Sequence, residues 1–339
     1  MKNNRMDLIS QLPDDLLLSI LSSLSLKDVM ATRFLSQRWR SIWKLVPKLN
    51  IDDHDLNRLC VKWVSSSLAF SNPQVLKSLD FKLIPGDFDR RETSFDRFSS
   101  LVKTAVYCGL RELRIELLYT SLEFPSILYA CGTLETLILC RLLLVDVPPD
   151  GSLSSLKTLR LLSVRFSSDE SVQKLLSICP VLKELVVRRS GYTNVEIFTI
   201  NVPTLTSLSV DYLRVGSHQP AGVHGFFINA PSLRYLNIRD RHSNYLLFKN
   251  MPELVKANVE VVCNQSESLI GSLASVRHLS LCSKFSNIPY HAGTSFIFLE
   301  HLELCTCSSE CWNLLACILK DPLRLRVIKL KSVCSIQFP

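Results

Sequence analysis

Residues 179–187 read CPVLKELVV, and the phrase LKELVV, which starts at Leu182, is one of a series of similar phrases. In each phrase, leucine or a close substitute fills the first, fourth and sixth positions. Apolar residues two apart predict a short β-strand with one buried face. The proline ahead of several phrases, as Pro180 is here, has no N–H to give to a sheet and holds the preceding residue extended. The stretch therefore predicts a turn followed by a half-buried strand.

The phrase recurs along most of the chain, with 21 to 28 residues between successive starts. Its ten copies begin at Leu110, Leu134, Leu156, Leu182, Leu205, Leu233, Leu254, Val276, Leu299 and Leu325. LKSLDF at Leu76 is expected to be an earlier copy. The period is that of leucine-rich repeats, in which each unit buries its strand by stacking on its neighbours. We therefore expect an α/β fold, a curved solenoid with a concave parallel sheet, and some repeats that return through a helix, as around residues 172–179.

Composition bounds the class of protein. The chain has 339 residues, 47% of them hydrophobic, which is enough to bury a large core. Apolar runs stay well short of the roughly 18 residues that a membrane span needs, and the N-terminus has acidic residues where a signal peptide is apolar. The 12 cysteines are scattered and are expected to be reduced thiols. These features indicate a soluble protein of the cytoplasm, the nucleus or both.

The first fifty residues follow a different pattern, with apolar residues at helical spacing. A first helix is predicted from the apolar face formed by Leu16, Leu17, Ile20, Leu21 and Leu24. Pro13 suits the first position of that helix, and Ser25 with Asp28 predicts a capped second helix. A third helix is predicted from Trp39, Ile42, Trp43 and Val46. A module of three short helices has little core of its own, so we expect it to complete its burial against a partner.

Residues 8–48 resemble an F-box. The resemblance rests on LP at Leu12 and Pro13, on the acid and leucines that follow, on KDV at residues 27–29 and on LSQRWRSIW at residues 35–43. Together with the repeats, it extends to the plant F-box, FBD and leucine-rich-repeat family over essentially the whole chain. The resemblance implies an F-box at residues 6–50, a linker and first irregular repeat at 51–105, leucine-rich repeats at 106–290, and final repeats resembling a truncated FBD region at 291–339.

In that family, the function implied is that of a substrate-recognition adaptor of a Skp–cullin–F-box E3 ubiquitin ligase. The F-box binds a Skp-type adaptor, and through it the cullin and RING subunits, while the repeats bind the protein to be ubiquitinated. The resemblance places at the Skp-binding surface, or in the packing beneath it, Leu12, Pro13, Leu16, Leu17, Ile20, Leu21, Leu24, Val29, Leu35, Ser36, Trp39 and Trp43. The alternative is a scaffold or interaction protein of the same architecture without ligase function.

Target binding is expected on the concave face, at the third and fifth positions of the phrases. The candidates are Arg114, Arg160, Tyr235, Asn237, Lys256, Asn258, His278, His301 and Glu303. Such a mixture of basic, polar and apolar side chains suits a protein surface better than a phosphate backbone, which favours an unbroken basic stripe. For any single residue the alternative is an ordinary solvated sheet face. His278 and His301, at the same position of adjacent repeats, are expected to be neighbours.

The sequence offers no support for catalysis or for a bound cofactor. It contains no Gly-rich phosphate loop, no H-E-x-x-H and no G-x-S-x-G. CTCSSEC at residues 305–311 resembles a metal cluster, but Cys305 and Cys307 are closer in sequence than a zinc-binding pair. We therefore expect that the chain is not an enzyme and that it binds no cofactor and no metal. The cysteines of this cluster are expected to be thiols that are buried or lie at a sheet edge.

The charge and the tryptophans point to a protein partner for the N-terminal module. A net charge of +8, from 39 Lys and Arg against 31 Asp and Glu, is mild for a nucleic-acid binder. Trp39 and Trp43 lie one helical turn apart in LSQRWRSIWK, where they are expected to anchor a docking helix. The arginines beside them would steer an acidic partner. We expect neither nucleic acid nor membrane to bind.

Overall fold

The computed structural model divides the chain into two compact units, residues 1–143 with 150–156, and residues 144–149 with 157–339. It describes residues 9–52, 76–83, 91–117, 125–144, 147–148, 150–190, 195–213, 223–240, 242–249, 251–262, 266–284, 295–305, 309–320 and 324–331. No helix among these residues combines the length and the apolarity of a membrane-crossing helix.

The first unit opens with short helices, as the sequence predicts. They are η1 (Ile9–Gln11), α1 (Asp14–Ser23), α2 (Leu26–Thr32), α3 (Trp39–Ile42) and η2 (Trp43–Leu45). Pro13 is the N-cap of α1 and not its first residue. The Ser25 side chain caps α2 by accepting the Asp28 N–H at 3.2 Å. The third predicted helix is a single α-helical turn that continues as the 3-10 helix η2.

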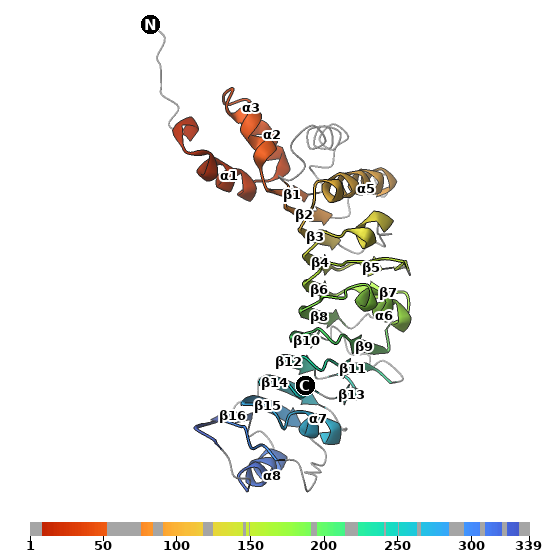
Figure 1. Ribbon diagram of the computed structural model, residues 1–339, viewed down its shortest axis with the longest axis vertical. Coiled ribbons are helices and arrows are strands. Elements are labelled where there is room, and N and C mark those ends of the chain that lie inside the picture. Colours follow the sequence, from red (N-terminus) through yellow and green to blue (C-terminus); the bar gives the residue numbers. More distant parts are fainter. Residues whose placement is uncertain are drawn as a thin grey trace. The chain divides into compact units, whose positions relative to one another are not determined.

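Four parallel strands follow in the first unit, in the order β1 (Lys48–Asp52), β2 (Ser78–Leu83), β3 (Glu112–Leu117) and β4 (Thr136–Cys140). The helix α5 (Arg91–Tyr107) and the 3-10 helix η5 (Ser126–Ala130) lie on one side of these strands, to the right in Figure 1. The expected early copy at Leu76 is confirmed as β2. The sequence prediction missed a still earlier copy. VPKLNI at Val46 also fits the phrase, and it forms β1 in register with β2.

The main sheet contributes eight described parallel strands to the second unit, each of which comes from one phrase. Their order is β6 (Thr158–Leu162), β8 (Glu184–Ser190), β10 (Ser207–Leu213), β12 (Tyr235–Asp240), β14 (Lys256–Val262), β15 (His278–Lys284), β16 (His301–Cys305) and β17 (Val327–Lys331). Each strand pairs with the next at equivalent phrase positions.

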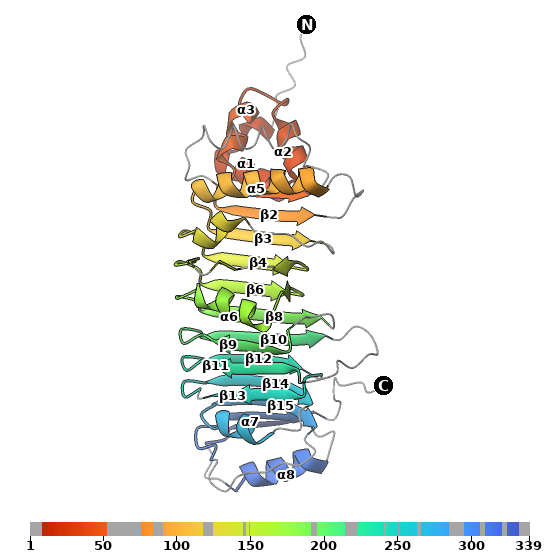
Figure 2. The same cartoon turned by 90° about the vertical axis from the view of Figure 1, so that its right-hand side faces the viewer.

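A second layer covers one face of this sheet (Figure 2). It contains the small parallel sheet of β9 (Ile197–Asn201), β11 (Gly225–Asn229) and β13 (Tyr245–Phe248), together with β7 (Arg165–Phe166), α6 (Asp169–Ser177) and α7 (Ser266–Ser272). The helix predicted around residues 172–179 is confirmed as α6, whose Val172, Leu175 and Leu176 are buried. Two further elements, β5 (Leu143–Leu144) and α8 (Ser309–Ile318), complete the described chain.

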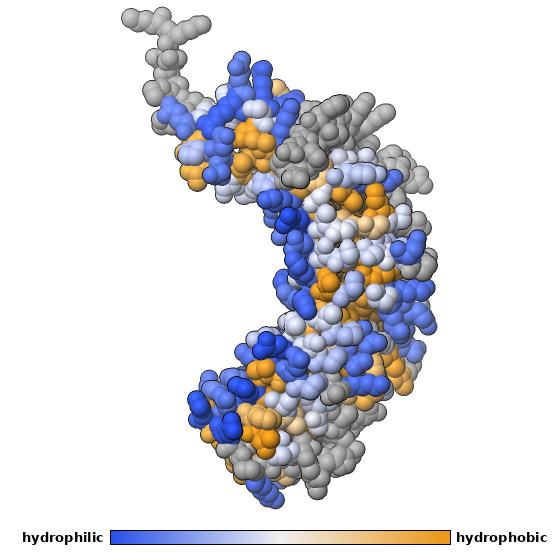
Figure 3. Space-filling model, viewed as in Figure 1, coloured by the Kyte–Doolittle hydropathy of each residue, from blue (hydrophilic) through white to orange (hydrophobic). Residues whose placement is uncertain are grey.

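The hydrophobic core lies between these layers. The fourth and sixth phrase positions fill it, as in Leu185 and Val187 of β8, which are at most 1% exposed. The third and fifth positions point to the opposite side of the sheet, which we call the open face. Hydrophilic side chains line this face in each unit (Figure 3). The predicted fold class, N-terminal helices followed by a leucine-rich-repeat solenoid with a parallel sheet, is confirmed.

Candidate functional site

The twelve residues predicted for partner binding in the helical module differ sharply in exposure. Pro13, Leu16, Ile20 and Leu35 are exposed, and Leu12, Leu24 and Ser36 are half-buried. The remaining five are buried, namely Leu17, Leu21, Val29, Trp39 and Trp43. The structure thus separates surface from packing, which the sequence left open. Phe34, at 76% exposure the most exposed apolar side chain of this module, was not predicted.

Burial places the two tryptophans in the packing beneath the surface, one of the two positions that the sequence left open for them. Trp39 is 2% exposed and Trp43 3%. The Trp39 Nε1–H donates to the Ser10 hydroxyl at 2.8 Å, and the Trp43 Nε1–H donates to the Arg40 carbonyl at 3.1 Å. Both indoles therefore hold the module together from within, because their polar atoms as well as their rings have partners inside the chain.

The arginines beside the tryptophans have different roles. Arg38 forms an ion pair with Asp14 and donates to the Ser10 carbonyl, so it ties the start of α3 to η1 and α1. Arg40 is exposed. Of these two arginines, only Arg40 is left to steer an incoming acidic partner.

On the open face of the second unit, amide side chains form a hydrogen-bonded ladder. Asn258 Nδ2 donates to Asn237 Oδ1 at 2.8 Å, and Asn237 Nδ2 donates to Ser209 Oγ at 3.0 Å. The three residues occupy the fifth phrase position of β14, β12 and β10. Because each amide uses its donor on the next strand, the ladder runs in one direction across three repeats.

The predicted histidine neighbours stack on each other. The rings of His278 and His301 lie 4.5 Å apart between centroids and 11° from parallel. The register pairs His278 with Lys256 on β14, and Lys256 with Tyr235 on β12. Four candidates at the third phrase position therefore form one row across adjacent strands, beside the amide ladder.

Glu303, whose register partner on β17 is Lys329, forms an ion pair. It bonds to Lys331 of β17 and accepts the Ser280 hydroxyl at 3.3 Å. The Lys331 ammonium holds the pKa of the Glu303 carboxyl below its ordinary value, and the carboxylate in turn raises the pKa of Lys331. Lys331 was not among the predicted residues, although it is one strand and two positions away from Glu303.

The two remaining candidates are apart from this group. Arg160 on β6 pairs with Glu184 at 3.1 Å. Arg114, in the first unit, bonds to Glu116 at 2.9 Å, which raises the pKa of Arg114, and it lies 3.7 Å from Asp80. Seven of the nine candidates thus lie together on β12 to β16, and the two arginines are engaged by carboxylates of their own neighbourhoods.

The cysteines that the structure describes show no grouping that would favour a metal. Cys305 is buried, and Cys307 lies outside the described residues. Within the described part of the chain, no three His, Cys, Asp or Glu side chains are placed to hold a metal ion. Burial raises the pKa of the Cys179 thiol to about 12, so this thiol is unsuited to act as a nucleophile.

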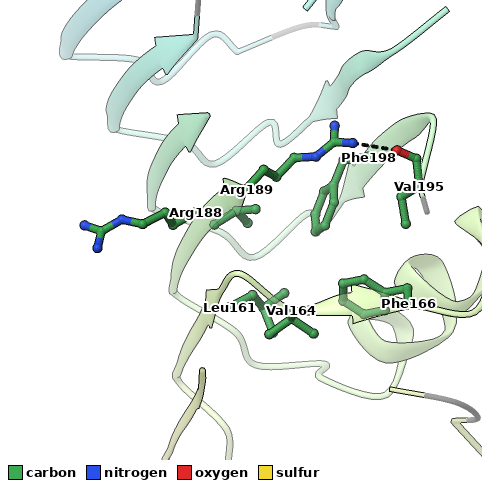
Figure 4. Close-up of a pocket in the computed structure, with 8 residues that line it drawn as sticks. Leu161, Val164, Phe166, Arg188, Arg189, Val195 and Phe198 are labelled. Carbon is green, nitrogen blue, oxygen red and sulfur yellow. Dashed lines mark hydrogen bonds between the residues drawn. The ribbon is translucent and has the colours of Figure 1, made fainter. Parts of the chain in front are cut away.

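An internal pocket of the second unit has a structural role (Figure 4). Arg189 enters it from β8 and is 3% exposed. Its guanidinium donates to the Gly225 carbonyl at 3.1 Å and to the Val195 carbonyl at 2.5 Å, and burial lowers its pKa. The neighbouring Arg188 points to the open face and pairs with Asp211 at 3.5 Å. Arg189 therefore fastens the second layer to the sheet.

Comparison with known proteins identifies both parts of the chain. The F-box domain family matches residues 9–50, and the leucine-rich-repeat family matches residues 155–180. An FBD-associated F-box protein of Arabidopsis thaliana is 46% identical over 96% of this chain and 77% of the relative. An F-box/FBD/LRR-repeat protein of the same plant is 42% identical over 95% of this chain and 71% of its own length. The chain belongs to the plant F-box/FBD/LRR-repeat family.

In this F-box/FBD/LRR-repeat protein, the twelve predicted partner-binding residues all lie within the matched F-box. The F-box and the repeats suggest a role as a ubiquitin-ligase substrate adaptor or as an interaction protein. Beyond the fold and the family, the geometry offers two surfaces of contrasting chemistry. One is the exposed apolar set of the F-box, and the other is the polar open face of β12 to β16.

Proposed function

We propose that this protein is the substrate-recognition adaptor of a Skp–cullin–F-box ubiquitin ligase, at work in the cytoplasm, the nucleus or both. The F-box binds a Skp-type adaptor, and the open face of the repeats binds the target protein. The chain itself catalyses no step and acts by bringing the reactants together. Holding a target lysine near a conjugating enzyme that carries ubiquitin raises the effective concentration of that lysine. Ubiquitin transfer is then done by other subunits.

The observation that best supports this proposal is the exposure of apolar side chains on the F-box. Leu16 is 52% exposed and Ile20 41%, one turn apart on α1, while their neighbours Leu17 and Leu21 are fully buried. An amphipathic helix of this kind normally hides one apolar stripe. This helix also shows apolar residues to solvent, as expected of a surface that a partner covers.

Co-purification with a Skp-type adaptor tests the proposal. The double variant Leu16→Ala/Ile20→Ala should lose adaptor binding. The matched control is Ile297→Ala/Phe298→Ala, which shortens two exposed apolar side chains of similar exposure, 44% and 45%, in the second unit and should leave adaptor binding unchanged. A wild-type chain that captures no Skp-type adaptor would refute the ligase function and leave the interaction protein of the same architecture.

A further inference from the structure

The second phrase position forms a row that neither the F-box nor the open face includes. Its backbone links are regular, because the N–H at this position bonds to the carbonyl of the same position one repeat earlier. Examples are Arg234 to Thr206 at 2.9 Å and Arg326 to Glu300 at 2.8 Å. The row therefore follows the edge of the second unit where the strands begin (Figure 2).

From β8 to β17, cations recur in this row on every second strand, and β6, next to β8, carries Lys157 at the same position. The four recurring cations are Lys183 before β8, Arg234 before β12, Arg277 before β15 and Arg326 before β17. We call these four residues the basic rim. Neighbouring strands lie about 4.8 Å apart, so successive cations of the rim start about 10 Å apart. Thr206, Val255 and Glu300 occupy the strands between.

Among the described residues, no acidic side chain forms an ion pair with the basic rim. All four side chains of the rim are exposed. Other cations of the repeats do pair. Arg239 lies 3.4 Å from Glu260 on the open face, and Arg111, at the second position in the first unit, lies 3.4 Å from Glu135. The rim thus presents exposed positive charge at a fixed interval.

We propose that the basic rim binds an acidic, extended segment of the target protein. This inference rests on the proposed function, in which the repeats capture a target. In the extended polyproline II conformation a chain has three residues per turn and advances about 3.1 Å per residue, so carboxylates three residues apart lie on one side at about 9 Å, close to the interval of about 10 Å along the rim. Such pairs at an exposed rim mainly steer and select the partner, which suits capture by an adaptor.

A protein segment fits the rim better than a nucleic acid does. A phosphate backbone carries charge continuously and favours an unbroken basic stripe. Here the cations are interrupted, and Glu300 places a carboxylate between two of them. A peptide can put a serine or a glycine opposite Glu300, whereas a nucleic acid would bring a phosphate there.

The test measures binding of a labelled peptide that carries glutamate at every third position and serine elsewhere, by fluorescence anisotropy with the full chain. The rim variant is Lys183→Gln/Arg234→Gln/Arg277→Gln/Arg326→Gln. The matched control removes the same charge elsewhere in the second unit, at Arg165, Lys174, Lys249 and Lys320, also to glutamine. At low salt we expect the rim variant to bind at least about tenfold more weakly and the control within about twofold of wild type, with wild-type binding weakened by added salt.

Several outcomes would overturn the proposal. These are equal weakening in the two variants, wild-type affinity in the rim variant, or equal binding of a peptide with glutamine in place of glutamate. Rim-dependent binding of oligo(dT) that is tighter than binding of the peptide would assign the rim to nucleic acid instead. Adaptor capture is measured on the same samples. Its failure in wild type would refute the ligase function while leaving the peptide result readable.

Discussion

Two adjacent residues of α1 should respond in opposite ways to the same shortening. Leu21 is fully buried, and a Leu→Ala change at such a site costs about 2 to 5 kcal/mol of unfolding free energy. Ile20 is 41% exposed, so only part of the roughly 1.5 to 3 kcal/mol of a fully buried side chain is at stake. Alanine also favours the helix more than isoleucine does. The net cost of Ile20→Ala in the free chain should therefore be about 1 kcal/mol or less.

Ile20→Ala, which should cost the free chain little stability, should nevertheless weaken its affinity for the Skp-type adaptor. Covering the exposed part of Ile20 on binding should contribute on the order of 1 to 2 kcal/mol, so Ile20→Ala should weaken the complex by roughly tenfold. Hydrogen exchange of the α1 amides reports the stability of the module, and calorimetric titration with the purified Skp-type adaptor reports affinity. We expect Leu21→Ala to lose amide protection and Ile20→Ala to keep it.

The reasoning would be refuted by either of two results. One is loss of α1 protection in Ile20→Ala as large as in Leu21→Ala. The other is wild-type affinity of Ile20→Ala for the adaptor, which would mean that this exposed face of α1 is not the surface that the adaptor covers.

Three further changes test the repeats. Gly225→Ala should destabilise the chain by about 2 kcal/mol or more, because a Cβ there would lie 1.6 Å from a backbone oxygen of β13; Gly271→Ala, with no atom within 4 Å, should cost nothing in thermal unfolding. Glu303 has a lowered pKa, so its pairing with Lys331 stabilises the fold above the ordinary value of 4.5 and less as pH falls through the lowered pKa. Glu303→Gln should therefore flatten the acid side of a urea-midpoint profile, whereas an unchanged slope would contradict this. Asn237→Ala should cost about 1 kcal/mol in urea unfolding by breaking the amide ladder, and no measurable loss would mean that water replaces it.

The repeat phrase predicted the sheet because its spacing carries both the strand and its buried face. It also predicted the register, which is why His278 and His301 could be expected from the sequence to be neighbours, although not to stack. The phrase at Val46 was missed for a physical reason. Val46 also continues the helical spacing of Trp39, Ile42 and Trp43, and one residue serves both patterns at the boundary of helix and strand.

Exposure was the part that the sequence could not settle. Helical spacing shows that Trp39 and Trp43 share a face, but not whether the chain or a partner covers it. Ser10, almost thirty residues earlier, accepts the Trp39 N–H and decides the matter. The basic rim was missed because only the third and fifth phrase positions were considered as surface. Reading the second position down the repeats would have found it.

The link between the F-box and the first strand has a consequence for building chimaeras. Asn50 of β1 donates through its side-chain amide to the Ser22 carbonyl at 3.0 Å and the Leu24 carbonyl at 3.3 Å, and a β-bridge joins it to Ser25. A graft cut just before β1 would separate an amide from the carbonyls that it satisfies. An F-box exchanged between two members of the family should therefore travel with residues 46–52, with the seam placed beyond Asp52.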